Sequence, residues 1–414
     1  MASATKSRLR AVANVEPALG WTYLSRDALA RAKAQMDEES MGVRDEIGFL
    51  TIHQGYADRF FPGTSVLHTR ARYLLFVPWL FEDLAPAAGP AAQRALTERE
   101  RVLAGRLRNQ PGQDEPDRRG TIGGVKFPNP SAQPPSTVYW NALATWGILR
   151  PRPDARAISR MQAHRLLSLA KAGKDDDGQP LVSYEPPFVT LPKRAPNWAD
   201  GEISLRMEKE EAAFLREHLI QVRPRDRAEL SLLARLARLK VLPPDDMFDP
   251  AVFALATDDR PALMRARQAA YLSGIGRAVY DALVEQIVID RDGKDPSTRH
   301  RSHLDVMVED YAPIAVELDI AGLETDIGAL PPRLLAVVEA IRAWLKKGAG
   351  DPSGLYEAFH AAEARKGPRA RLALSPNGRA RRAEWASDQH VLADILHYRW
   401  TQVRTLLIDV AQPA

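Results

Sequence analysis

Apolar positions recur at helical spacing along most of the chain. Between residues 203 and 222 the apolar side chains fall on one side of a helix, and between 227 and 242 leucines recur at nearly the same interval. A spacing of roughly three to four residues indicates amphipathic helices rather than strands. The same pattern predicts further helices over residues 24–37, 91–107, 159–171, 262–285, 332–346, 355–364 and 388–410. The expected fold is therefore a mainly α, multi-domain helical protein.

Composition divides this helical pattern into parts. Residues 111–135 are dense in glycine and proline and are expected to form a linker. They separate an N-terminal helical domain, residues 1–110, from a module over residues 136–225. The remaining residues, 226–414, are expected to form a C-terminal helical domain with a basic loop.

The module over residues 136–225 has the parts of a small winged-helix-like α+β unit. Two helical patterns are followed by a stretch that reads as a hairpin, with its turn at Asp177–Gly178. The alternative is an irregular helical segment, because the same parts occur in both. The sequence leaves this choice open.

One apolar run is preceded by two arginines, in the stretch FFPGTSVLHTRARYLLFVPWLFEDL that begins at Phe60. Thr64 or Ser65 can cap a helix there, and Pro78 is expected to kink or end it. From Tyr73 onward the run is apolar on every side, which predicts burial all round.

Arg70 and Arg72 stand where this buried run begins. Two residues apart, they point to different faces of a helix. A guanidinium at the edge of a core needs a carboxylate or a phosphate partner. We expect one arginine to join an internal network, with Asp45 and Glu46 as candidate acids, and the other to contact phosphate.

Clusters of acids and histidines raise the possibility of metal chemistry. The region between Asp45 and Asp58 is the basis for one hypothesis, a metal-dependent nuclease. His300 and His303 would share a helix face, as metal ligands can. Neither spacing matches an established metal pattern, and capped helices and polar turns account for both. We therefore expect no metal and no cofactor, and no catalytic residue.

The strongest local feature is an acid-free basic run. Between residues 365 and 382 the sequence has seven cations and no acid, and two turns at Gly367–Pro368 and Pro376–Gly378 predict a loop or hairpin. Tryptophan and tyrosine side chains follow it. Arginines near aromatic rings suit phosphate contact and base stacking. The candidate nucleic-acid-binding residues are Arg365, Lys366, Arg369, Arg371, Arg379, Arg381, Arg382, Arg399, Arg404, Arg70 and Arg72.

Composition limits the compartment and the chemistry. The chain has 414 residues, 45% hydrophobic and 27% charged, with a net charge of +4 and no cysteine. This excludes disulfides, thiolate metal sites and a cysteine nucleophile. The longest apolar run, residues 73–81, is shorter than the roughly 20 residues that a membrane-spanning helix needs. We expect a cytoplasmic protein without membrane contact.

Three stretches together carry a resemblance over most of the chain. DEIGFLTIHQGYADRFFPGTSVLHTRARYLLFVPW, YLSGIGRAVYDALVE and LHYRW resemble a family of bacterial proteins of unknown function. The resemblance implies gene neighbourhoods of phage defence, with helicases and phospholipase-D-like nucleases as neighbours. It implies a role beside DNA processing and supplies no catalytic residues.

These observations predict a non-catalytic, nucleic-acid-binding accessory subunit of a bacterial anti-phage defence complex. DNA rather than RNA is the expected nucleic acid, and helicase or nuclease proteins are the expected partners. A second hypothesis is a protein-interaction scaffold without nucleic-acid contact, in which the basic run meets acidic protein surface. Pairing of that run with acids inside the chain would favour the scaffold.

Overall fold

The computed structural model describes residues 46–85, 89–109, 119–152, 157–171, 185–194, 198, 200–239, 241–293, 298–385 and 390–414. The helices in the first half of this range are α2 (Leu50–Phe60), α3 (Tyr73–Asp83), α4 (Gly89–Arg108), α6 (Pro135–Val138), α7 (Trp140–Thr145), α8 (Arg160–Lys171) and α9 (Lys209–Leu219). Those in the second half are α10 (Leu232–Arg238), α11 (Pro250–Ala256), α12 (Arg260–Asp290), α13 (Arg299–Ala315), α14 (Ile320–Ile327), α15 (Pro332–Lys346), α16 (Tyr356–Glu363), α17 (Pro376–Ala383) and α18 (Trp400–Ala411). Three 3-10 helices, η1 (Thr257–Asp259), η2 (Pro352–Leu355) and η3 (Ala364–Arg369), connect some of them.

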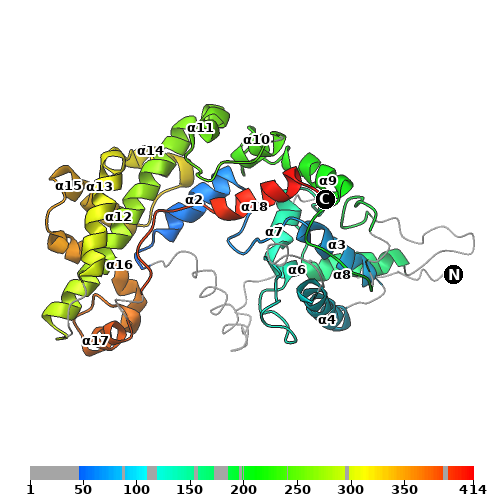
Figure 1. Ribbon diagram of the computed structural model, residues 1–414, viewed down its shortest axis with the longest axis horizontal. Coiled ribbons are helices and arrows are strands. Elements are labelled where there is room, and N and C mark those ends of the chain that lie inside the picture. The colour runs from blue at the N-terminus through cyan, green and yellow to red at the C-terminus, as the bar shows by residue number, and fades with distance from the viewer. Residues whose placement is uncertain are drawn as a thin grey trace, which may run out of the picture.

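The mainly helical fold is confirmed, and the helices form two groups along an elongated molecule (Figure 1). One group contains α11–α17, arranged around the long helix α12, which packs along α13 and also touches α15 and α14. The other contains α3, α4 and α6–α9. Helices α2 and α18, from opposite ends of the described chain, lie between the groups. Helix α2 packs on α14 and α12, whereas α18 packs on α9 and α10.

One connected hydrophobic core runs through both groups. Glycines in α12 permit its closest approach to neighbouring elements. A Cβ atom on Gly276 would lie 2.5 Å from the Phe49 ring, and one on Gly274 would lie 2.9 Å from the Met307 methyl. These glycines serve helix packing, as their small size predicts.

The apolar run after Arg72 is buried as predicted, but the helix boundaries differ. Helix α3 begins at Tyr73, not near Thr64, and Pro78 lies inside it. Proline removes one backbone donor and crowds the preceding turn. The helix continues because residues 73–81 are all buried, so surrounding side chains hold it in place. The expected helix start near Thr64 is therefore wrong, and of the two expectations for Pro78, a kink or an end, the end is wrong.

Caps also shorten two predicted helices. Helix α9 begins at Lys209, because Glu208 and Glu211 form a reciprocal capping box there. Helix α10 begins after Ser231, whose side chain accepts a hydrogen bond from the Ala234 amide. The residues before each cap are irregular. Periodicity alone had extended both helices towards the N-terminus.

The winged-helix-like module is not supported. Among the described residues of 136–225 no sheet forms, and two isolated bridges occur, Leu149 with Phe188 and Pro151 with Ala157. The segment 185–192 contains three prolines, which cannot donate to a strand ladder. The expected turn at Asp177–Gly178 and the expected helix over 24–37 lie outside the described residues. The division into three domains and a linker stays a prediction.

Within the described ranges, none of the helices combines the length and the apolar character needed to cross a membrane.

Candidate nucleic-acid interface

Residues 365–382, called the basic segment below, lie at one end of the α11–α17 group (Figure 1). They fold into η3 and α17, not into a hairpin. The turn expected at Pro376–Gly378 is wrong, because Ser375 caps α17 and accepts a hydrogen bond from the Gly378 amide at 3.3 Å. Pro376 then takes the first helical position, where its missing donor costs nothing.

Arg382 is the structural anchor of this segment. Its side chain is 2% exposed and donates to both carboxylate oxygens of Asp292, at 2.7 and 3.1 Å. It also donates to the carbonyl oxygens of Arg371 and Ala373, at 2.5 and 2.8 Å. A buried cation with this many partners fixes α17 against the end of α12. It does not face solvent.

Two further cations of the segment share one acid. Lys366 and Arg371 both pair with Glu46, Arg371 at 2.9 Å. The buried carboxylate of Glu363 accepts the amides of Arg371 and Leu372 at 2.8 Å each, and also the hydroxyl of Tyr280. Backbone and side chains of the segment are therefore tied to the helical core. Glu46 serves this segment and not Arg70 or Arg72.

The other cations lie on the outer face of the segment: Arg365, Arg369, Arg379 and Arg381 are exposed. The side chain of Arg379 is 67% exposed. Its Nε atom makes a long contact of 3.8 Å with Asp292, an acid that already pairs with Arg382. Arg381 pairs with Glu384 at 2.8 Å on the surface. Surface pairs of this kind are weak and exchange readily with other anions.

The aromatic side chains expected to stack with bases are buried. Trp385 packs beside the ring of His300, with 4.9 Å between the centroids. The Tyr398 hydroxyl donates to the Ala266 carbonyl oxygen at 2.8 Å, and the Trp400 indole donates to a backbone carbonyl. The structure therefore contradicts the expectation of a stacking surface next to the basic segment.

Arg399 and Arg404 lie at the start of α18, away from α17 (Figure 1). Arg399 donates to Asp58 at 2.7 Å and to the Thr64 carbonyl oxygen at 2.8 Å. Arg404 pairs with Asp245 at 2.6 Å. Arg399 has φ 64°, in the left-handed region that few non-glycine residues adopt. The structure does not bring these two arginines to the basic segment.

Arg70 and Arg72 both pair with acids that the sequence had not indicated. Arg70 makes two 3.0 Å hydrogen bonds from Nε to Asp409, whose carboxylate also accepts the Ala71 amide. Burial raises the pKa of Asp409, and Arg70 opposes that rise. Arg72 donates to Glu211 at 2.8 Å. Both guanidinium groups thus have internal carboxylate partners.

Asp45 lies outside the described residues, and the acids near it have cationic partners. Glu46 holds Lys366, and Asp58 holds Arg399. Among the residues that the structure describes, no group of three or more histidines and acids could hold a metal ion.

The histidines proposed as metal ligands point to different partners. The ring of His303 lies 2.7 Å from the Ala393 carbonyl oxygen. His300 faces Asp281 at 3.9 Å, and His390 approaches the other oxygen of the same carboxylate at 3.6 Å. Both contacts are long, and the two rings, 5.7 Å apart between centroids, share this one carboxylate.

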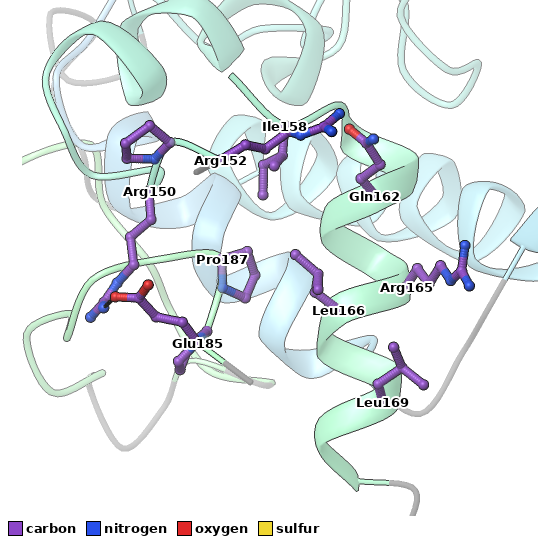
Figure 2. A pocket seen from close by; sticks show the side chains of 11 residues that line it. Arg150, Arg152, Ile158, Gln162, Arg165, Leu166, Leu169, Glu185 and Pro187 are labelled. Carbon is purple, nitrogen blue, oxygen red and sulfur yellow. Dashed lines mark hydrogen bonds and ion pairs between the residues drawn. The ribbon is translucent and has the colours of Figure 1, made fainter. Parts of the chain in front are cut away.

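Two features escaped the sequence analysis. The acids that hold the buried arginines are far away along the chain, and no local pattern marks them. The second feature is a groove beside α8, lined by apolar and arginine side chains (Figure 2). Its signal in the sequence is an apolar position of α8 beyond the buried stripe, Leu169, which is 44% exposed.

The chain belongs to a family of unknown function, DUF6361, whose model matches residues 18–325. No curated protein and no solved structure matches the chain.

Proposed function

We propose that this protein binds nucleic acid, DNA rather than RNA, through the outer face of the basic segment. The supporting observation is the exposure of Arg365, Arg369, Arg379 and Arg381 on a segment whose other cations are fixed to Glu46 and Asp292. The fixed cations hold the backbone in place, and the other four arginines are exposed on it. Such an arrangement presents positive charge without having to order a loop first.

The expected mode of binding is contact with phosphate groups. Trp385, Tyr398 and Trp400 are buried, so the described surface near the segment offers no stacking platform of these rings. Single-strand binding proteins rely on such platforms, whereas duplex binding rests on phosphate contacts. Duplex DNA is therefore the favoured ligand, and the expected binding depends little on base sequence.

We further propose that the protein is a non-catalytic accessory subunit in bacterial anti-phage defence. The support is the resemblance stated above, with its helicase and nuclease neighbours. In this role the protein places DNA beside a partner that carries out the chemistry. The proposed cytoplasmic location follows from the same role.

The decisive experiment measures duplex DNA binding of the whole chain across a salt series. The test variant combines Arg369→Glu, Arg379→Glu and Arg381→Glu. A matched control combines Arg94→Glu, Arg223→Glu and Arg225→Glu, which are exposed arginines outside the α11–α17 group. Each lost phosphate contact should reduce the slope of log affinity on log salt by about 0.9. The test variant should lose both affinity and slope, and the control should keep them.

Equal loss in both variants would show that net charge alone drives binding and would contradict an assignment to the basic segment. Unchanged binding in the test variant would place the interface elsewhere. Absence of binding by the unmodified protein at low salt would overturn the nucleic-acid proposal.

The second candidate function is a protein-interaction scaffold. The observation that favours it is the pairing of Lys366, Arg371 and Arg382 with acids inside the chain. These cations serve the fold, which lowers the charge left for phosphate. If the protein fails to bind DNA at low salt, this candidate predicts a protein partner that co-purifies with it. The metal-dependent nuclease hypothesis has no comparable support, because Glu46 and Asp58 are each engaged by cations.

A further inference from the structure

Helix α17 presents opposite faces to the core and to solvent. Gly378 and Arg382, which lie one above the other on the helix, are buried. A Cβ atom on Gly378 would overlap the Ala373 carbonyl oxygen, so this face lies directly on the chain that precedes the helix. Arg381 and Glu384 belong to the side that stays exposed.

The two exposed residues form an ion pair on the surface of the basic segment. The Nη1 atom of Arg381 donates to both carboxylate oxygens of Glu384, at 2.8 and 3.1 Å. The side chains are 44% and 63% exposed. Glu384 is also the first acid after the acid-free run. A phosphate that approaches Arg381 therefore meets a guanidinium group that already has a carboxylate partner.

Helix stability does not explain the acid at this position. Glu384 is the C-cap residue of α17. The C-terminus of a helix carries partial negative charge, which favours cations there and disfavours a carboxylate. The order of the pair is also the less stabilising one, because the arginine precedes the acid along the helix. The effect of Glu384 is therefore to be sought at the surface, in the charge that it presents beside Arg381.

Arg379 differs from Arg381 in the acid that it leaves behind on turning to a phosphate. Its contact with Asp292 is 3.8 Å long, and Asp292 keeps Arg382 at 2.7 Å when Arg379 turns away. Within the described ranges, Glu384 forms its ion pair with Arg381 alone. A phosphate contact of Arg381 therefore leaves a bare carboxylate beside the DNA backbone, whereas a contact of Arg379 does not.

We propose that Glu384 restrains the basic segment by competing with DNA phosphates for Arg381. This inference rests on the proposed function, because the competing ligand is DNA. The restraint has two physical parts. The ion pair has to break before Arg381 can contact a phosphate, and the carboxylate then lies next to groups of its own charge. The segment consequently binds DNA more weakly than its exposed arginines alone would allow.

The restraint predicts a particular dependence on salt. Each phosphate contact releases about 0.9 salt cations from duplex DNA. A bare carboxylate at Glu384 attracts a salt cation in return, so the contact of Arg381 adds little to the slope of log affinity on log salt. Removal of the charge at Glu384 lets Arg381 contribute in full.

The test measures binding of the whole chain to a labelled DNA duplex across a salt series, for the unmodified protein and for Glu384→Gln. The matched control is Glu98→Gln, which removes the same charge from an exposed pair with Arg101 on α4, with the same spacing along the helix. A second comparison repeats Glu384→Gln in an Arg381→Gln background. This double-mutant cycle separates an effect through Arg381 from direct repulsion between the carboxylate and DNA.

Glu384→Gln should bind the duplex about two- to fivefold more tightly, which is the range that an exposed ion pair contributes. Its salt slope should become steeper by up to about 0.9. The Glu98→Gln control should change neither quantity. Most of the gain should disappear in the Arg381→Gln background.

Unchanged affinity of Glu384→Gln, while the charge-reversal variant of Arg369, Arg379 and Arg381 loses binding, would overturn the restraint and leave the proposed function intact. An equal gain in the Arg381→Gln background, or in Glu98→Gln, would show general repulsion instead and would also overturn it. Absence of binding by both the unmodified protein and Glu384→Gln at low salt would overturn the proposed function and the restraint together.

Discussion

At the scale of single residues, buried charges in this protein are mostly paired, and Glu100 is an exception. It is 4% exposed, and its Oε1 atom accepts the Ser136 amide at 2.7 Å. Its Oε2 atom has no hydrogen-bond partner among the described residues. Burial raises the pKa of Glu100 from 4.5 to about 7, and the Ser136 amide only partly opposes that rise. The protonated carboxyl is thus the form that the fold prefers.

This pKa shift predicts a pH dependence of stability. The folded carboxyl binds its proton more tightly than the unfolded one, so the free energy of unfolding falls as the pH rises from 4.5 to 7. Glu100→Gln mimics the protonated form and should stabilise the protein above pH 7 by about 3 kcal/mol. Below pH 4.5 the gain should vanish. Urea unfolding at several pH values measures both, with exposed Glu98→Gln on the same helix as the control. A gain that stays constant across the pH range would contradict the assignment.

The sequence placed arginines correctly at the edge of a buried run but could not name their partners. Arg72 pairs with Glu211, and Arg70 pairs with Asp409. Local patterns report which side chain needs a partner, because burial follows from neighbouring apolar residues. They do not indicate which acid, far away along the chain, pairs with that side chain in the fold. The four exposed arginines of the basic segment could be predicted, whereas the burial of Arg382 could not.

At the scale of elements, α12 combines great length with two glycines that sit against other side chains. A Cβ atom on Gly276 would lie 2.5 Å from Phe49 and 2.8 Å from Ile341. Phe49 is a rigid ring in the core, so it cannot move aside at small cost. Close packing at Gly276 therefore outweighs the low helix propensity of glycine.

Gly276→Ala tests this balance. Helix propensity alone would stabilise the protein by about 1 kcal/mol. Overpacking against Phe49 costs about 1–3 kcal/mol, and we expect a net loss of stability in urea unfolding. Gly354→Ala in η2 is the control, because nothing lies within 4 Å of its Cβ position. A net gain for Gly276→Ala would mean that the core can adjust and that packing does not explain this glycine.

Element boundaries show why periodicity predicts helices better than their ends. The long pattern of α12 was recognised, because errors of two residues at its start and five at its end leave its period intact. Helix α9 was drawn too long, since the capping box at Glu208 competes with an apolar pattern that continues before it. The continuation of α3 through Pro78 depends on burial from all sides, which the local sequence does not contain.

At the scale of the whole molecule, the last helix completes the packing of the first half of the chain. Helix α18 packs on α9 and α10, and its Asp409 holds Arg70 just before α3. Phe61, which follows α2, packs against Trp400, with 5.8 Å between the ring centroids. The two groups of helices therefore share this central contact, and residues at opposite ends of the described chain depend on each other. No pattern in either stretch alone could have predicted this.

Asp409→Ala should consequently destabilise the whole molecule and not only α18. The substitution leaves the Arg70 guanidinium, 13% exposed, without its carboxylate, and breaking a buried pair in this way costs about 3–5 kcal/mol. Arg70→Met combined with Asp409→Ala should recover part of the loss, because no uncompensated charge then remains. Arg381→Ala on the exposed pair with Glu384 is the control and should change stability little.

Urea unfolding followed by circular dichroism and by tryptophan fluorescence should show coincident transitions if the two groups unfold together. Separate transitions, with only one shifted by Asp409→Ala, would show instead that the groups are independent and that α18 stabilises its own neighbours alone.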